Sequence, residues 1–355
     1  MRRFASFAST LVLAVTFALP SAAETSRWDW LRARVFGTPP VETNAKAAED
    51  ALARRGGTRM ILQIDSGRLR PAVIETMRDD TRRALREAGI PWAGRPNVRD
   101  GSVEMRLREA DVDRAKNALG EFFGRATIDL HEMGGGVITL APTTADFGAR
   151  LRGAREQAID VIRLRVKELG IAPADVRADD SDRIVVLLPG VTEPARLALL
   201  TARAELTFRL VDVSMTPADA LRSRPPLESE VLYDKSKEPL LVHKQVLMSG
   251  KELLEATAII DHRTQEPVIA FRFTTAGAKE FGRITQENVG RPFAIVLDQD
   301  VIMAPVIREP ILGGSGQISG GFSVEQANDL AILLRSGALP AGLVVVEQRT
   351  VEPQK

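Results

Sequence analysis

Apolar positions between residues 56 and 211 follow two periods, one typical of strands and one typical of helices. The run TRMILQI (58–64) reads as a buried strand, and the alternation from Glu205 to Val211 predicts another. Between them, spacings of three and four predict a helix that Gly170 ends as its C-cap. Its apolar stripe comprises Ala158, Ile159, Ile162, Val166 and Leu169.

The pattern occurs twice, at a constant offset of 81 residues. Ala-Gly-Ile (88–90) precedes the run VEMRL at Val103, and Leu-Gly-Ile (169–171) precedes IVVLL at Ile184. Each copy reads strand, helix, hairpin, helix, strand, which predicts two ferredoxin-like βαββαβ repeats over residues 56–211 and an α+β fold class. The same offset aligns Met77 with Ala158, Leu85 with Val166, Leu107 with Leu188, and Ala118 with Leu199.

The second half of the chain begins with a proline-rich stretch. Residues 212–239 hold four prolines among charged residues and are predicted to be a connector. Beyond it, Ser323 and Gln326 have the spacing of a capping box, and Gly337 is expected to stop that helix. The further predicted elements are a helix over 248–258, strands over 268–273, 293–297 and 301–306, a helix over 276–286, and a last strand over 343–350 that can pair back into the first half.

The N-terminus has the features of a secretory signal peptide. Two arginines precede the apolar run LVLAVTFAL, and Ser-Ala-Ala at 21–23 offers small residues for cleavage before Glu24. We therefore expect a signal peptide over 1–23 and a periplasmic mature protein. The alternative is an uncleaved N-terminal anchor that keeps the protein at the inner membrane. Residues 24–55 read as a linker with one short helix, Ala45 to Arg54.

Composition excludes several kinds of chemistry. The chain has no cysteine, three histidines that are far apart in sequence, and a formal charge of +1. We therefore expect no metal, no cofactor and no nucleic-acid partner. The glycine-rich run GGSGQISGG (313–321) lacks the lysine of a phosphate loop, and Asp298 and Asp300 flank a predicted turn. We expect no catalytic residues and no small-molecule substrate, so the chain is not predicted to be an enzyme.

One apolar stretch is a candidate for binding. QVLMSGKELL (245–254) carries a methionine among aliphatic side chains. Apolar residues of this kind are mostly core, whereas methionine-bearing surfaces can adapt to varied partners, such as unfolded peptide. Both readings remain open, and the candidate preprotein-binding residues are Val246, Leu247, Met248, Leu253 and Leu254.

Several segments resemble SecD, the accessory subunit of the bacterial Sec translocon, in its large first periplasmic domain. The resemblance covers residues 54–351. It is most specific in the block from NVGRPFAIVLDQD (288–300) to LPAGLVVVEQRTV (339–351), and it includes AREQAIDVIRLRVKELGI (154–171), DRIVVLLPGVTEPARLALL (182–200) and AELTFRLV (204–211).

The resemblance implies a base made of the two repeats and a mobile head. The head would span 240–336, with hinge candidates at Pro239 and Gly337, and residues 337–355 would return to the base and form the tail. The implied role is to bind or hold unfolded preprotein on the periplasmic side, with SecF and the Sec translocon channel as possible partners. The C-terminal membrane helices of that family are expected to be lacking. The alternatives are a structural or regulatory SecD paralogue without preprotein binding, or the periplasmic half of a split SecD subunit.

Overall fold

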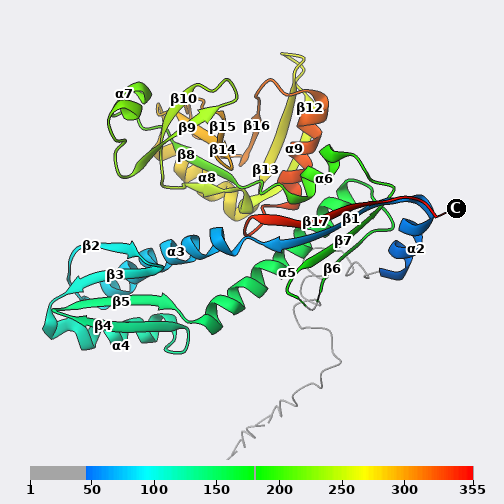
Figure 1. Ribbon diagram of the computed structural model, residues 1–355. Coiled ribbons are helices and arrows are strands. Elements are labelled where there is room, and N and C mark those ends of the chain that lie inside the picture. Colours follow the sequence, from blue (N-terminus) through cyan, green and yellow to red (C-terminus); the bar gives the residue numbers. More distant parts are fainter. Residues whose placement is uncertain (1–44, 180, 355) are drawn as a thin grey trace, which may run out of the picture. The chain divides into compact units, whose positions relative to one another are not determined.

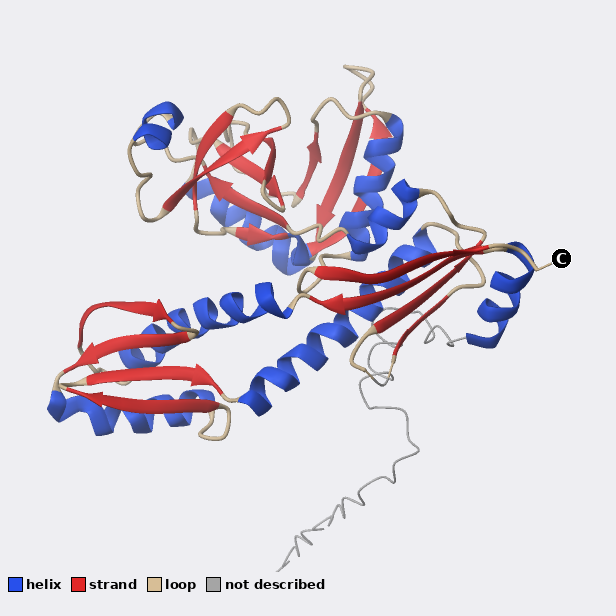
Figure 2. Cartoon of the chain, viewed as in Figure 1, coloured by secondary structure: helices blue, strands red, loops and turns tan. Residues whose placement is uncertain are grey.

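The protein is described from a computed structural model that places residues 45–179 and 181–354. The predicted signal peptide (1–23) and most of the predicted linker lie outside the described residues. Across the placed part of the chain, no helix is both long and apolar enough to cross a membrane. The predicted short helix is α2 (Ala45–Arg55). The fold is mixed α and β with four separate sheets (Figures 1 and 2).

The first sheet, called here the β1 sheet, has the antiparallel order β17-β1-β7-β6. Helices α5 and α6 share a core with one face of it, and α2 packs against β7 through Ala48 and Leu52. The elements are β1 (Gly57–Ile64), α5 (Thr144–Glu168), β6 (Asp175–Ala178), β7 (Ile184–Pro189), α6 (Pro194–Thr201) and β17 (Leu343–Val351).

The second sheet, called here the β3 sheet, has the antiparallel order β2-β3-β5-β4. Alternate residues of its strands pack against α3 and α4, which gives this part of the chain a core of its own. Asp100 and Gly101, both at positive φ, form the predicted turn between β2 and β3. The elements are α3 (Ser66–Glu87), β2 (Trp92–Arg99), β3 (Ser102–Leu107), η1 (Glu109–Asp111), α4 (Val112–Phe123), β4 (Ile128–Gly134) and β5 (Val137–Pro142).

The two predicted repeats are not found as self-contained units, because their first strands are exchanged. Strand β1 opens the first predicted copy but lies between β7 and β17, and β5 opens the second copy but lies between β3 and β4. Helices α3 and α5 make the exchange by running from one sheet to the other. Equivalent positions are still buried alike, since Met77 and Leu85 are as inaccessible as Ala158 and Val166.

Residues 206–336 form what we call the two-sheet region. A six-stranded sheet, β10-β9-β15-β14-β8-β11, and a three-stranded sheet, β12-β13-β16, share one core with α8 and α9. The elements are β8 (Leu206–Leu210), α7 (Pro217–Arg222), β9 (Ser229–Asp234), β10 (Pro239–His243), β11 (Met248–Ser249), η2 (Gly250–Glu252), β12 (Leu253–Ile260), β13 (Pro267–Phe273), α8 (Thr275–Glu287), β14 (Phe293–Leu297), β15 (Asp300–Met303), β16 (Ser315–Ile318) and α9 (Val324–Ser336).

Three sequence-based expectations fail in this region. The predicted helix over 248–258 is instead β11, a 3-10 turn and β12, because residues 253–260 pair along β13. The predicted connector over 212–239 contains α7 and β9. The alternating pattern over 205–211 predicted a last strand for the second repeat. The strand formed there, β8, lies between β14 and β11 in the six-stranded sheet. Strand β17 occupies the edge of the β1 sheet instead, as expected for the last strand.

Candidate functional site

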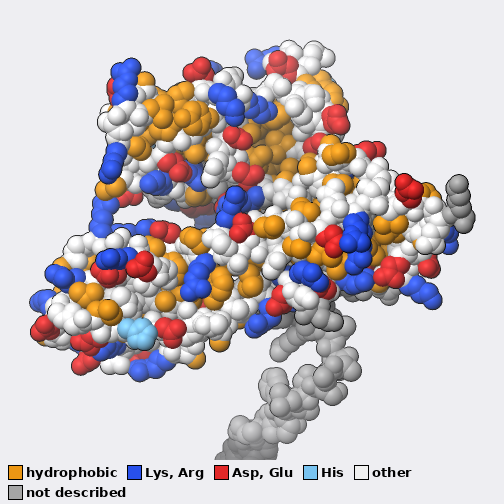
Figure 3. All heavy atoms as spheres, in the orientation of Figure 1, with side chains coloured by type: hydrophobic (Ala, Val, Ile, Leu, Met, Phe, Trp, Pro, Cys, Tyr) orange, Lys and Arg blue, Asp and Glu red, His pale blue; other side chains and the backbone are white. Residues whose placement is uncertain are grey.

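An apolar cavity of about 270 Å3 lies in the two-sheet region, and we call it the aromatic pocket. Strands from both sheets contribute to it, since Phe208 and Phe293 come from the six-stranded sheet and Phe271 from the three-stranded sheet. Apolar side chains reach the surface over β9 and β15 and in a recess beside β16 (Figure 3). The remaining lining residues are Phe281, Ile295, Met303, Pro305, Val306, Ile307, Arg308, Glu309, Ile311, Gly316 and Gln317.

The floor of the aromatic pocket is a cluster of phenylalanine rings. The ring of Phe208 stacks on Phe293 at 5.6 Å between centroids and lies 6.2 Å from Phe271 and 5.9 Å from Phe281. These side chains meet because inward positions of β8, β13 and β14 alternate with outward ones, and α8 turns Phe281 toward the same core. All four rings are at most 5% exposed and belong to the core of the two-sheet region, so the floor of the pocket is continuous with that core.

The wall next to β16 depends on a glycine. A side chain at Gly316 would start 2.7 Å from the ring of Phe271, so only glycine lets this ring lie against β16. On the rim, Val306 is 53% exposed, and Arg308 and Glu309 carry opposite charges beside it. The pocket is therefore apolar inside and mixed in charge at its mouth.

A lysine joins the two sheets near the aromatic pocket. The ammonium of Lys235, in the turn between β9 and β10, lies 3.5 Å from the ring centroid of Phe322 and donates to the carbonyl of Gly320 at 3.1 Å. Burial lowers the pKa of Lys235 from its ordinary value. The contact holds the β9–β10 turn against the segment between β16 and α9.

The chain passes between the β1 sheet and the two-sheet region twice, at residues 202–205 and 337–341, which we call the neck. The two passages hydrogen-bond to each other through the Leu339 amide and the Arg203 carbonyl at 2.9 Å. A second cavity of about 230 Å3 lies here, lined from both passages and by Leu253. The neck is therefore a paired, partly hollow junction.

A fully buried arginine on α5 fixes the neck. The guanidinium of Arg165 donates to the carbonyls of Leu199, Leu200 and Ala202 at 2.9, 3.1 and 2.5 Å, where α6 ends. It also donates to the Ser336 hydroxyl at 3.2 Å and the Gly337 carbonyl at 3.0 Å, where α9 ends. A cation at two helix C-termini complements the partial negative charge of both.

The charge of Arg165 persists despite its burial. Burial lowers its pKa to about 10, and Asp298 opposes that shift, so the side chain remains protonated at neutral pH. The carboxylate of Asp298 also accepts from the amides of Ala204 and Glu205 at 3.3 and 2.9 Å. Beside them, Arg335 pairs with Glu168 at 2.6 Å. The neck thus combines one buried cation with carboxylates nearer the surface.

The predicted binding residues do not line the aromatic pocket. Met248 is 5% exposed and belongs to the core, and Leu247 and Leu253 are partly buried against that core. Only Val246 and Leu254 are largely exposed. The pocket phenylalanines were missed because each lies in a short run that reads as ordinary strand or helix core. The one sequence signal for the pocket was the glycine-rich segment that forms β16.

The two hinge candidates lie in different surroundings. Gly337 follows α9 with φ +82 and stands in the neck, where its carbonyl accepts from Arg165. Pro239 begins β10, the edge strand of the six-stranded sheet, and is paired with Tyr233 of β9, so it lies in that sheet rather than at a chain passage. Hinge motion at either position stays a prediction. Among the residues that the structure places, no three His, Asp or Glu side chains are grouped to hold a metal ion.

Two family models match the chain. Residues 155–213 match "Protein translocase subunit SecDF, P1 domain, N-terminal", and residues 229–341 match "SecDF, P1 head subdomain". Among curated relatives, the protein translocase subunit SecD of Acetobacter pasteurianus is 37% identical over 305 residues, which are 84% of this chain and 58% of that protein. SecD of Calditerrivibrio nitroreducens is 34% identical over 312 residues, covering 84% and 60%. The chain thus spans about three fifths of the length of these relatives.

Solved structures of SecDF are also similar in sequence. One, described as a membrane component that enhances protein export, is 37% identical, with 55% of this chain and 92% of that chain covered and a TM-score of 0.46. Another, in a super-membrane-facing form, is 36% identical over 56% of this chain and 28% of that chain, with a TM-score of 0.47.

Proposed function

Because the chain belongs to the SecD family through its P1 region, we propose that it is a SecD-like accessory component of Sec-dependent protein translocation. Its task is to bind unfolded preprotein on the periplasmic side of the inner membrane, with SecF and the translocon channel as partners. The observation that carries this proposal is the aromatic pocket, which opens within residues 229–341 apart from its floor residue Phe208.

Unfolded chains are suited to such a pocket because they expose the apolar side chains that a folded protein buries. Four phenylalanines supply the floor, and the rim holds one cation and one anion beside Val306. An apolar floor gains affinity from any large apolar side chain and distinguishes poorly between sequences. Binding should therefore be weak and broad, as an assistant of many exported proteins requires.

The β1 and β3 sheets have a related internal organisation. We infer that the β1 and β3 sheets derive from one duplicated ferredoxin-like unit whose first strands were exchanged. The constant offset of 81 residues and the matching burial of Leu85 and Val166 support it. The exchange makes α3 and α5 the only covalent links into the β3 sheet, as Figure 1 traces.

The test uses photo-reactive residues in a translocating system. A crosslinker at Val306, on the rim of the aromatic pocket, should label an arrested preprotein, whereas one at Arg114 on α4 should not. Equal labelling at both positions, or labelling at Arg114 alone, would favour the structural or regulatory paralogue. A companion variant is Val306→Asp, which should reduce binding of an unfolded peptide. Val344→Asp on β17, where the valine is comparably exposed, is its control.

A neighbouring gene that encodes membrane helices of the SecD type would favour the split-subunit alternative. In that case co-purification of the two products is expected, and the aromatic pocket keeps the same role.

A further inference from the structure

Strand β16 has one edge that is not paired with β13. Among the strands of the described residues, β16 is the last of its sheet and has β13 as its one neighbour. The amide of Phe273 donates to the carbonyl of Gly314, so Phe273 and Gly314 are a hydrogen-bonded pair of this antiparallel ladder. Hydrogen-bonded pairs alternate in such a ladder, so Gly316 and Ile318 also bond toward β13.

Ser315 and Gln317 lie between these hydrogen-bonded residues, so their amides and carbonyls point away from β13. Within residues 45–179 and 181–354, no backbone hydrogen bond from either residue to another element is present. Gln317 also lines the aromatic pocket. A row of donors and acceptors at strand spacing therefore stands at the pocket's own wall.

We propose that β16 binds the client by strand addition, so that an extended polypeptide segment becomes a fourth strand of the β12-β13-β16 sheet. This inference rests on the proposed function and specifies how the segment is held. Main-chain bonds to Ser315 and Gln317 supply a sequence-independent part of the affinity.

The geometry also assigns a direction to the client's side chains. Phe271 and Gly316 form one cross-strand row on the core side of the sheet, and the ring of Phe271 lies over Gly316, where a side chain would start 2.7 Å from it. A client residue opposite Gly316 would continue that row, and its side chain would enter the aromatic pocket beside the ring of Phe271. Every second client residue would point away, because side chains alternate along a strand.

The surroundings favour a polypeptide over another apolar ligand. The edge of β16 offers donors and acceptors in turn at the spacing of a strand. Another peptide backbone can bond to both kinds of group along this edge. Arg308 and Glu309 stand at the rim, and neither has an ion pair within the placed residues. An anionic lipid headgroup would meet Glu309, whereas a polypeptide of mixed charge complements both side chains.

The decisive variant is Gln317→Pro. Proline removes the outward amide of residue 317 and leaves the ladder to β13 intact, since proline is tolerated where an edge amide faces away from the sheet. The probe is a short fluorescein-labelled peptide with one central phenylalanine flanked by serine and threonine, measured by fluorescence anisotropy. Loss of one main-chain bond should weaken binding by about fivefold. Gln317→Ala is the matched control and should bind like the unaltered protein.

A second measurement needs no change in the protein. Methylating single backbone amides of the peptide should weaken binding at alternate positions only, since only every second amide of an added strand faces β16. If Gln317→Pro binds normally and methylation has no two-residue period while Val306→Asp still loses binding, strand addition is wrong and the pocket proposal stands. If no peptide binds even to the unaltered protein, both proposals fail. A change in self-association with Gln317→Pro, with peptide binding unaltered, would replace the client by a second copy.

Discussion

Two connections leave the β1 sheet, and they are built in opposite ways. Toward the β3 sheet, residues 66–73 of α3 and 143–153 at the start of α5 contain no buried residue. The neck, toward the two-sheet region, buries Ala204 and Leu339, and next to it the guanidinium of Arg165 bonds to the buried Leu200 carbonyl of α6. Segments with few buried contacts open at low cost in free energy. We therefore expect the β3 sheet to move relative to the β1 sheet through α3 and α5, and we expect the neck to keep a fixed geometry.

The sequence-based hinge candidates were Pro239 and Gly337, and only Gly337 lies in the neck. The structure gives that glycine a left-handed backbone but also ties its carbonyl to a buried cation. A change of backbone geometry at Gly337 requires the hydrogen bonds of Arg165 to break together. We therefore expect a switch between two discrete arrangements of the neck rather than a continuous hinge motion.

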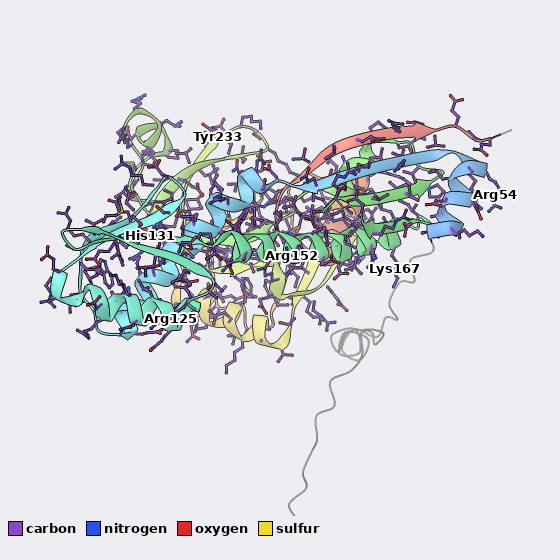
Figure 4. The ribbon with its side chains drawn as sticks, turned by 60° about the horizontal axis from the view of Figure 1, so that its bottom comes forward. Arg54, Arg125, His131, Arg152, Lys167 and Tyr233 are labelled. Atoms are coloured by element: carbon purple, nitrogen blue, oxygen red, sulfur yellow. The ribbon has the colours of Figure 1, made fainter. Side chains whose placement is uncertain are left out.

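Arg165→Met should destabilise the protein by about 3–5 kcal/mol, because it leaves buried carbonyls of Leu200 and Gly337 without a donor. Urea unfolding measures the loss, and amide exchange should accelerate at both passages of the neck. The control is Arg152→Met on the exposed first half of α5 (Figure 4), expected within about 0.5 kcal/mol of the unaltered protein. Equal stability of both variants would show that the buried network does not fix the neck.

Asp298→Asn should cost about 1 kcal/mol. Asparagine tolerates the positive φ of 58 at this position but weakens the charged acceptor for the amides of Ala204 and Glu205. Asp300→Asn, two residues along the same hairpin, is the control and should have no effect. A larger effect for Asp300 would contradict the role given to Asp298. Thermal unfolding of the two variants side by side provides the measurement.

Glu168→Gln should cost about 0.5 kcal/mol in low salt and nothing in high salt, because its pair with Arg335 is about one-third exposed on both sides. Arg335 retains its bond to the carbonyl of Ala256 at 2.7 Å. Denaturant unfolding at two salt concentrations measures the difference. A loss that is independent of salt would mean that this pair is as essential to the neck as Arg165.

Arg70→Ala should change stability by about 0.5 kcal/mol or less and change dynamics more. The guanidinium of Arg70 on α3 lies 5.2 Å from the ring centroid of Phe147 on α5, so this cation–π contact links the two helices. Amide exchange should quicken in 66–73 and 143–153 but not in the neck. Arg86→Ala, at an exposed position near the end of α3, is the control. Faster exchange in the neck instead would reverse the comparison.

Local features were predictable where the residues themselves cause them. The capping box of Ser323 and Gln326 forms as expected, because both partners lie within one turn of α9. The turn at Asp100 and Gly101 likewise needs only local backbone angles. The failed helix over 248–258 shows the limit: Leu253 and Leu254 are compatible with either period, and pairing with β13 decided for a strand.

The candidate site was less accessible to sequence reasoning than the fold. Met248 was a candidate as a methionine within an apolar stretch, yet it faces the core. The aromatic pocket needs Phe208, Phe271 and Phe293, which are distant in sequence and meet only through two different sheets. Arg165 looked like one of many charges on an amphipathic helix, and nothing local marks it as fully buried.

The sequence by itself determined the periods of the strands and helices, the duplicated pattern, the caps and turns, and the resemblance to SecD, because each depends on residues close together or on a long matching block. Only the tertiary structure decided which sheet each strand joins, that β1 lies between β7 and β17 and β5 between β3 and β4, and that Arg165 lies between the ends of α6 and α9. The physical reason is that hydrophobic period specifies which face of a strand is buried, whereas its neighbours are chosen by packing and hydrogen bonding across the whole chain.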